Sequence, residues 1–241
     1  MTIPAGYKIL CGGAQVSPPA GGRWGNFLTA SYPPNIFAWT ALAKDQDNPA
    51  ATTITAYAIA LNDPNDQYDV QIFTATSVPS SDTPTVSVSL PPGYRLVGGG
   101  AQANYGSAGQ FLITSAPLAD LSGWQASSRW HLHSDPGTVI AFAIGIRLRA
   151  GAASISTKLF HDTTANPQSR PEEDVGVGPG YSVIGGGASV SMGFATIGNL
   201  LTASYPKDLD GLVEWQVSSR DQDGNDPEII TAYAIGAMTG T

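Results

Sequence analysis

The chain has 241 residues, of which 42% are hydrophobic and only 12% are charged. This length allows one large domain or three small ones, and the surface must consist mainly of uncharged polar side chains, which are typical of extracellular proteins and of sites for neutral ligands such as sugars. The net charge of −8 argues against nucleic acid, whose affinity comes from Lys and Arg on phosphates. No apolar run approaches the length of a membrane-spanning helix, so we expect no membrane span.

The first four residues, Met1 to Pro4, have neither the basic start nor the apolar run of a signal peptide. Together with the composition, this predicts a protein that is extracellular or released without a classical signal peptide. A protein that stays inside the cell is the alternative.

One phrase occurs three times: Gly-Tyr, three further residues, and a run of small residues ending in Gly-Gly-Ala. It begins at Gly6, Gly93 and Gly180, in equal steps of 87 residues. Repeats of fixed length indicate one structural unit that is used several times. We expect a single domain, 1–241, made of repeats 1–61, 93–149 and 180–241 and connectors 62–92 and 150–179.

The first repeat predicts strands at 7–16, 27–32, 37–43 and 53–61, because these segments are short, rich in β-branched and aromatic residues, and bounded by Gly and Pro. Equivalent strands are expected in the other repeats, and each connector adds a strand pair, at 70–77 with 85–90 and at 154–160 with 174–177. No window shows helical periodicity with a cap. The fold class is therefore all-β.

The small-residue runs stand inside predicted strands, where glycine is normally unfavourable. They predict a β-bulge, or a close approach of backbones around a shared axis. A phosphate-binding loop is disfavoured because neither Lys-Ser/Thr nor a helix follows. Cys11 takes the place of Gly98 and Gly185, so we expect a small buried residue; as the only cysteine it cannot form an intrachain disulfide.

Three-fold repetition of this length favours a β-prism-like assembly with pseudo-three-fold symmetry, built from three four-stranded sheets. The units of a β-trefoil are much shorter, and a propeller uses roughly four to eight blades. Tandem β-sandwich units are the alternative. The recurring Trp39, Trp124 and Trp215 stand at matched strand positions and are expected in the core.

Polar loops follow these tryptophans. The first and third repeats carry an Asp-x-Asp pattern with Asn nearby, and in the second repeat Trp130 takes the place of the first aspartate; the residues are Asp45, Asp47 and Asn48, and Asp221, Asp223 and Asn225. Clustered oxygens suit calcium, with Asp45, Asp47, Asp221 and Asp223 as ligands, although a polar hairpin turn favours the same residues. Sugar binding is a third interpretation of these loops. Asn26, Gln110 and Asn199 would then form a second ring of ligand-binding residues, and Trp24, Tyr32, Tyr105 and Tyr205 are nearby aromatic residues that could stack on a sugar.

His131, His133 and Asp135 would share one face if their segment were a strand, and that spacing can bind zinc. A solvated sheet edge is favoured over the metal site. The acidic run 172–174 is expected to be a solvated loop. Neither Gly-x-Ser-x-Gly nor His-Glu-x-x-His occurs, so we expect no enzyme.

The pattern Gly-Gly-Gly-Ala, Leu-Thr-Ala-Ser-Tyr-Pro, Trp and Thr-Ala-Tyr-Ala-Ile resembles a repeat found in many uncharacterised secreted bacterial proteins, notably from actinobacteria. The second repeat departs from it, with Ala116 and Phe142 where the other copies have tyrosine. The resemblance implies secretion but carries no established activity.

These observations predict a non-enzymatic, multivalent, lectin-like protein whose partners are glycans, because weak sites gain avidity through repetition. A toxin-associated or surface-targeting module is the alternative, and a polysaccharide hydrolase is less favoured. No cofactor is expected apart from calcium. The sequence is compatible with a homo-oligomer but does not predict one.

Overall fold

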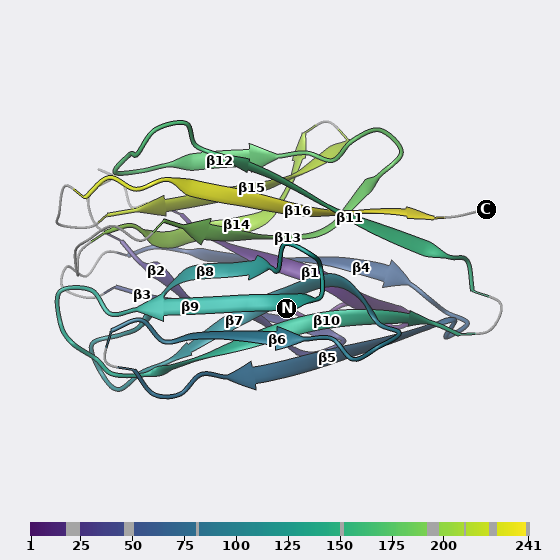
Figure 1. Ribbon diagram of the computed structural model, residues 1–241, viewed down its shortest axis with the longest axis horizontal. Coiled ribbons are helices and arrows are strands. Elements are labelled where there is room, and N and C mark those ends of the chain that lie inside the picture. Colours follow the sequence, from purple (N-terminus) through teal and green to yellow (C-terminus); the bar gives the residue numbers. More distant parts are fainter. Residues whose placement is uncertain are drawn as a thin grey trace.

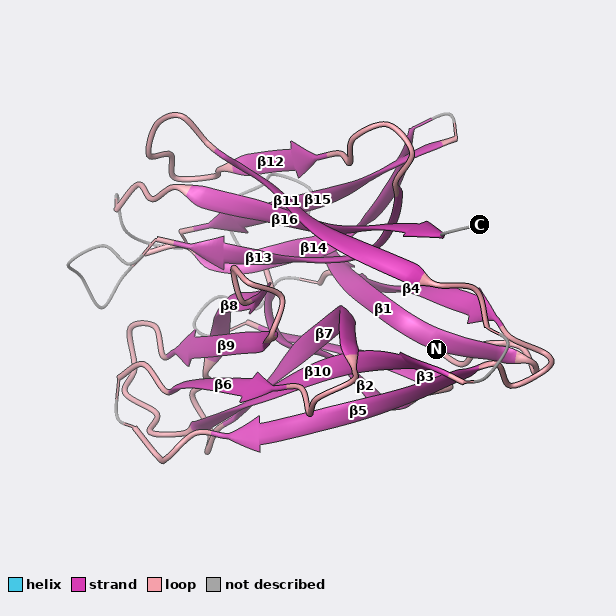
Figure 2. Cartoon of the chain, turned by 45° about the vertical axis from the view of Figure 1, so that its right-hand side comes forward, coloured by secondary structure: helices cyan, strands magenta, loops and turns pink. Residues whose placement is uncertain are grey.

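The computed structural model describes residues 1–17, 25–45, 51–80, 82–149, 152–191, 198–209, 211–221 and 226–239. These residues form sixteen β-strands and no helix, which confirms the all-β prediction (Figure 2). In chain order the strands are β1 (Tyr7–Val16), β2 (Phe27–Asn35), β3 (Ala38–Lys44), β4 (Ile54–Asn62), β5 (Tyr68–Thr76), β6 (Thr85–Ser89), β7 (Arg95–Asn104), β8 (Phe111–Pro117), β9 (Gly123–Arg129), β10 (Thr138–Leu148), β11 (Ile155–Thr163), β12 (Glu172–Val175), β13 (Ser182–Val190), β14 (Leu200–Leu209), β15 (Leu212–Arg220) and β16 (Ile230–Thr239).

The strands form three antiparallel sheets whose strand orders are β12-β15-β14-β1-β4, β3-β2-β7-β10-β5 and β11-β16-β13-β8-β9-β6 (Figure 1). The prediction of four strands in each sheet is wrong, because the sheets have five, five and six strands. Each sheet takes strands from two repeats and from at least one connector. Self-contained tandem sandwiches are excluded for the same reason. The acidic run at the start of β12 is an edge strand of the first sheet, where charge discourages pairing with other chains, and not a loop.

The extra strands are the connector strands β5, β6, β11 and β12, whereas the other four strands of each sheet are brought together by an exchange of hairpins between repeats. The β2–β3 hairpin of the first repeat pairs with β7 of the second, and β8–β9 of the second pairs with β13 of the third. The ring closes when β14–β15 of the third repeat pairs with β1 of the first, where Ser204 lies opposite Ala14. Every repeat thus completes the sheet of the next repeat instead of closing its own.

The three tryptophans are the largest fully buried side chains, as predicted. The indole N–H of each donates a hydrogen bond to a serine Oγ of the preceding strand: Trp39 to Ser31 at 3.0 Å, Trp124 to Ser115 at 3.1 Å, and Trp215 to Ser204 at 2.9 Å. Each indole lies against the middle glycine of its repeat, where any Cβ would come within 2.4 Å of the ring. The glycine is therefore required by the volume of the tryptophan.

Both expectations for the small-residue runs are confirmed. The register of β1, β7 and β13 shifts by one residue just before each run, which is a β-bulge. The strands also approach each other there: Cys11 is fully buried, and its Sγ lies 3.9 Å from the carbonyl oxygens of both Gly99 and Gly186. A Cβ on Gly98 would lie 2.5 Å from that of Cys11, so the second repeat has no room for a side chain.

Candidate functional site

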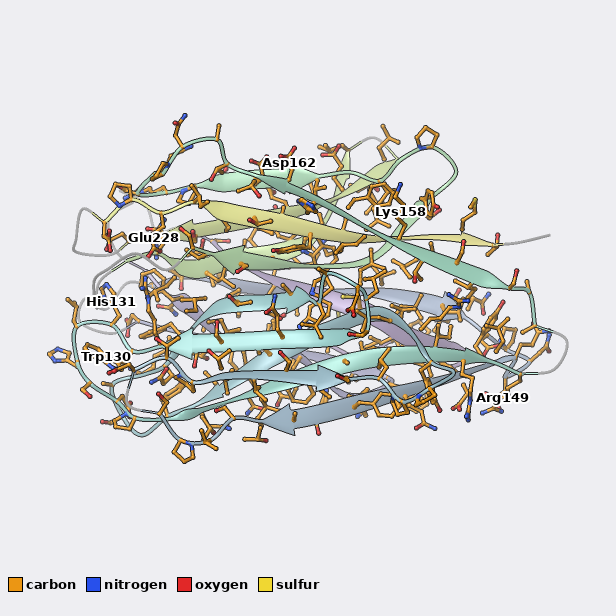
Figure 3. The ribbon with its side chains drawn as sticks, viewed as in Figure 1. Trp130, His131, Arg149, Lys158, Asp162 and Glu228 are labelled. Carbon is orange, nitrogen blue, oxygen red and sulfur yellow. The ribbon has the colours of Figure 1, made fainter. Side chains whose placement is uncertain are left out.

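Trp130, one of the predicted loop residues, lies at the same end of the molecule as His131 and Glu228, whereas Arg149 lies at the opposite end (Figure 3). Asp47, Asn48, Asp223 and Asn225 fall outside the described residues. Asp45 is half-buried, and its backbone carbonyl accepts a hydrogen bond from Lys44 Nζ at 3.0 Å. Trp130 is also half-buried, with its ring nitrogen enclosed.

Asp221 is buried, and its carboxylate contacts groups of the surrounding loops. One oxygen lies 3.8 Å from His131 Nε2, and the other accepts the backbone N–H of Asp226 at 3.1 Å. The described residues include no cluster of three or more His, Cys, Asp or Glu side chains placed to hold a metal ion. Since two of the four proposed ligands fall outside those residues, calcium binding stays a prediction.

Two of the three amide residues of the predicted second ring, Gln110 and Asn199, form hydrogen bonds with other segments of the chain. Gln110 and Asn199 are fully buried. Gln110 donates from Nε2 to the carbonyl of Asp135 at 2.7 Å and accepts from Ser128 Oγ at 3.1 Å, while Asn199 donates to the carbonyl of Gln168 at 2.9 Å. Asn26 is half-buried. Ligand binding by these three amides stays a prediction, but two of them face other protein groups.

The segment with His131, His133 and Asp135 is a loop and not a strand, so the condition for a shared face of these three side chains is not met. His133 is exposed, whereas His131 and Asp135 are buried, so a solvated edge describes only His133. Asp135 accepts backbone N–H groups from Gly106, Ser107 and Gly109 at 2.7–2.9 Å. Burial alone would raise the pKa of this carboxyl, but these hydrogen bonds outweigh it and lower the pKa.

A second polar constellation lies on one face of the first sheet. Gly13 stands between Tyr57 on β4 and the β14 residue Tyr205, on neighbouring strands. Because Gly13 has no side chain, the two rings meet above it and stack, with centroids 4.7 Å apart and an interplanar angle of 25°. The last glycine of the run thus makes room for an aromatic pair.

Two amides hold the phenol groups of this pair. Tyr57 donates from its hydroxyl to Gln15 Oε1 at 3.0 Å, and Gln15 donates from Nε2 to the Tyr205 hydroxyl at 3.2 Å. Tyr205 in turn donates to Gln216 Oε1. Burial raises the pKa of Tyr205, so its hydroxyl stays protonated at neutral pH. We call Gln15, Tyr57, Tyr205 and Gln216 the tyrosine–glutamine row.

A groove of about 180 Å³ adjoins the row and shares Gln15 with it. We call it the sheet groove; its lining residues are Gln15, Val16, Arg170, Glu172, Thr202, Ser218, Ser219 and Arg220. The hydroxyls of Thr202 and Ser218 lie 2.8 Å apart within it. The groove therefore combines hydroxyl, amide and charged groups on four neighbouring segments of one sheet.

The other two sheets carry weaker versions of the row. Tyr32 and Phe142 stack over Gly100 with centroids 4.8 Å apart, and Gln102 takes the place of Gln15. In the third sheet Tyr233 lies opposite Gly187, but Ala116 replaces the second aromatic residue. The first sheet thus has the full set of polar and aromatic groups.

Sequence reasoning singled out Tyr205 but missed Gln15, Tyr57, Gln216 and the groove residues. The available signal was the recurrence of Gln15 and Tyr57 at equivalent positions, on the strand face opposite the buried residues. No protein-family model matches the chain, and no curated protein matches it either. Among the described residues, no helix has the length and apolar character to cross a membrane.

Proposed function

We propose that the protein binds carbohydrate without catalysing a reaction, and that the tyrosine–glutamine row with the sheet groove is its principal site. The observation that carries the proposal is the hydrogen-bonded chain of two phenols and two amides, fixed beside a polar groove. Amides and hydroxyls both donate and accept hydrogen bonds, which suits the hydroxyl groups of sugars. Groups already held in place lose little entropy when they bind.

The dimensions also support this proposal. Pockets for drug-sized ligands have volumes of roughly 300–1,000 Å³. The sheet groove, at about 180 Å³, is smaller and open, which suits one ring of a longer chain. We take the three sheets as faces of a three-fold prism, so that related rows on its faces engage one glycan surface together and gain avidity.

A glycan array probed with and without calcium tests the proposal. We expect calcium-independent binding that falls at least tenfold in Gln15→Ala and Tyr205→Phe, since tenfold corresponds to about 1.4 kcal/mol, close to one hydrogen bond. Gln102→Ala is the matched control in the second sheet and should have a smaller effect. Absence of glycan binding in both conditions overturns the proposal. If binding requires calcium and is lost in Asp45→Asn, the binding site lies in the loops and not in the sheet groove.

The β14–β15 hairpin favours a second function, a surface-targeting module. Leu212 is 73% exposed at its tip, and Leu209 and Val213 are about two-fifths exposed beside it. Exposed apolar groups that cluster in this way mark interaction surfaces. Cell binding or lysis that is lost in Leu212→Ser and is unaffected by competing sugars would favour this function over carbohydrate binding.

A further inference from the structure

Arg220 is a buried cation in an unusual position. It ends strand β15, is only 7% exposed, and lines the sheet groove. A terminal nitrogen of its guanidinium donates one long hydrogen bond, at 3.4 Å, to the carbonyl of Asn26, and the guanidinium lies 5.0 Å from the centre of the Phe27 ring in a cation–π contact. Within the described residues Nε has no hydrogen-bond partner, and no carboxylate forms an ion pair with this guanidinium.

Comparison with Arg129 and Lys44, the equivalent residues of the other two repeats, shows why the environment of Arg220 is unusual. Arg129 ends β9 and is equally buried, but Glu228 Oε2 lies 3.5 Å from its terminal nitrogen and balances its charge. Lys44 ends β3, is half-buried, and donates to two backbone carbonyls at 3.0 Å. A buried charge is costly unless an opposite charge accompanies it. Arg220 is thus the buried member of the set that no carboxylate of the described residues balances.

A second arginine lines the same groove. Arg170 is exposed, immediately precedes β12, and lies close enough to Arg220 for the two charges to repel each other. Burial and this repulsion together lower the pKa of Arg220 to about 10, which still leaves it charged at neutral pH. Among the described residues that line the groove, Glu172 is the one carboxylate beside the two arginines. In a chain with a net charge of −8, the described lining residues thus carry more positive than negative charge.

We infer that the sheet groove selects an anionic sugar, with a carboxylate or sulfate group on its ring bound between Arg220 and Arg170. The inference rests on the proposed carbohydrate-binding function and names its ligand class. Such a group receives charge-assisted hydrogen bonds from the two guanidinium groups. The hydroxyls of Thr202 and Ser218 and the amide of Gln15 then face the rest of the sugar ring. Glu172 disfavours a second negative group on the same ring.

Calorimetric titration with three probes tests this inference: methyl glucuronide, methyl glucoside and a sulfated methyl glucoside. We expect at least one of the two anionic probes to bind at least tenfold more tightly than the neutral one. The probe that does so shows whether the groove prefers a carboxylate or a sulfate. Raising the salt concentration should reduce this preference, because ions screen charge. Arg170→Gln and Arg220→Gln should both reduce it to less than threefold.

Arg95→Gln is the control variant, since it removes the same charge from an exposed position at the start of β7. It should leave the preference unchanged. If Arg220→Gln does not fold, the exposed Arg170→Gln still decides the question. Equal affinity for the three probes overturns the anionic ligand and leaves the carbohydrate-binding proposal intact. Absence of binding to the probes and to the glycan array overturns both.

Discussion

Gly186 is a position where one added methyl group should strongly destabilise the protein. A Cβ built there would lie 2.3 Å from both Trp215 Cδ2 and the carbonyl oxygen of Tyr233, whereas ordinary contact begins at 3.4 Å. Trp215 is fully buried and is held by the hydrogen bond to Ser204. Tyr233 belongs to a strand that is paired on both sides. Neither neighbour can retreat by an ångström without breaking contacts.

The cost of Gly186→Ala can be worked from these contacts. Overpacking costs about 1–3 kcal/mol. Displacement of the indole from its serine acceptor adds about 1–3 kcal/mol. Reduced freedom of the unfolded chain returns roughly 0.4–1 kcal/mol. The free energy of unfolding should therefore fall by about 1–6 kcal/mol, with a midpoint near 3 kcal/mol, against the roughly 5–15 kcal/mol that a typical domain has.

Urea unfolding followed by tryptophan fluorescence and circular dichroism measures this loss. Gly176→Ala is the control, because the nearest atom to its added Cβ is Glu214 Oε1 at 3.5 Å, and its effect should stay within about 0.5 kcal/mol. Replacing Trp215 by Leu should cost less in the Gly186→Ala background than in the parent, since it removes one of the two clashes, the one with the ring. A Gly186→Ala protein within about 1 kcal/mol of the parent would refute the packing argument.

Three further predictions concern the same framework. Ser31→Ala, Ser115→Ala and Ser204→Ala should each lower the free energy of unfolding by about 1–3 kcal/mol, since each leaves a buried indole N–H without its acceptor; unequal losses in urea unfolding would show that the three sites are not equivalent. The lowered pKa of Asp135 contributes stability that is present above the unfolded-state pKa and is lost as pH falls through the folded-state value, so Asp135→Asn should be less stable at pH 7 and should show a weaker loss between neutral and acid pH in thermal unfolding. Burial raises the pKa of the Cys11 thiol, so a thiol reagent should modify it only in urea; rapid modification of the native protein would contradict its place at the centre.

Local patterns in the sequence predicted much of the fold. The strand at 7–16 matches β1, and the three core tryptophans were identified because each depends on neighbours within its own repeat. The burial of Cys11 followed from its alignment with Gly98 and Gly185, although its neighbours belong to the other repeats. The hairpin exchange was not predicted. Alternation along β2 shows which side chains face inward, but not that its partner is β7 of another repeat. Strand pairing across repeats is a tertiary property that no local pattern encodes.

The candidate site was predicted less well, for a similar reason. Tyr57 and Tyr205 lie far apart in the chain and meet only because β4 and β14 flank β1. The polar loops looked like the site because Asp, Asn and Gln are usually exposed. Gln110 and Asn199 are instead buried because the crowded loop ends need hydrogen-bond partners there. Whether a carboxylate lies beside Arg220 depends on how distant segments fold, and within the described residues none forms an ion pair with it.

The exchange of hairpins also has a consequence for synthesis on the ribosome. Strand β1 pairs with β14, which emerges about 190 residues later. At roughly 5–20 residues per second, the open edge of β1 waits about 10–40 s for its partner. An unpaired strand edge invites pairing with other chains. The first sheet to begin is therefore completed only from the third repeat, and the nascent chain is most exposed to misassembly, and to chaperone binding, until that repeat has emerged.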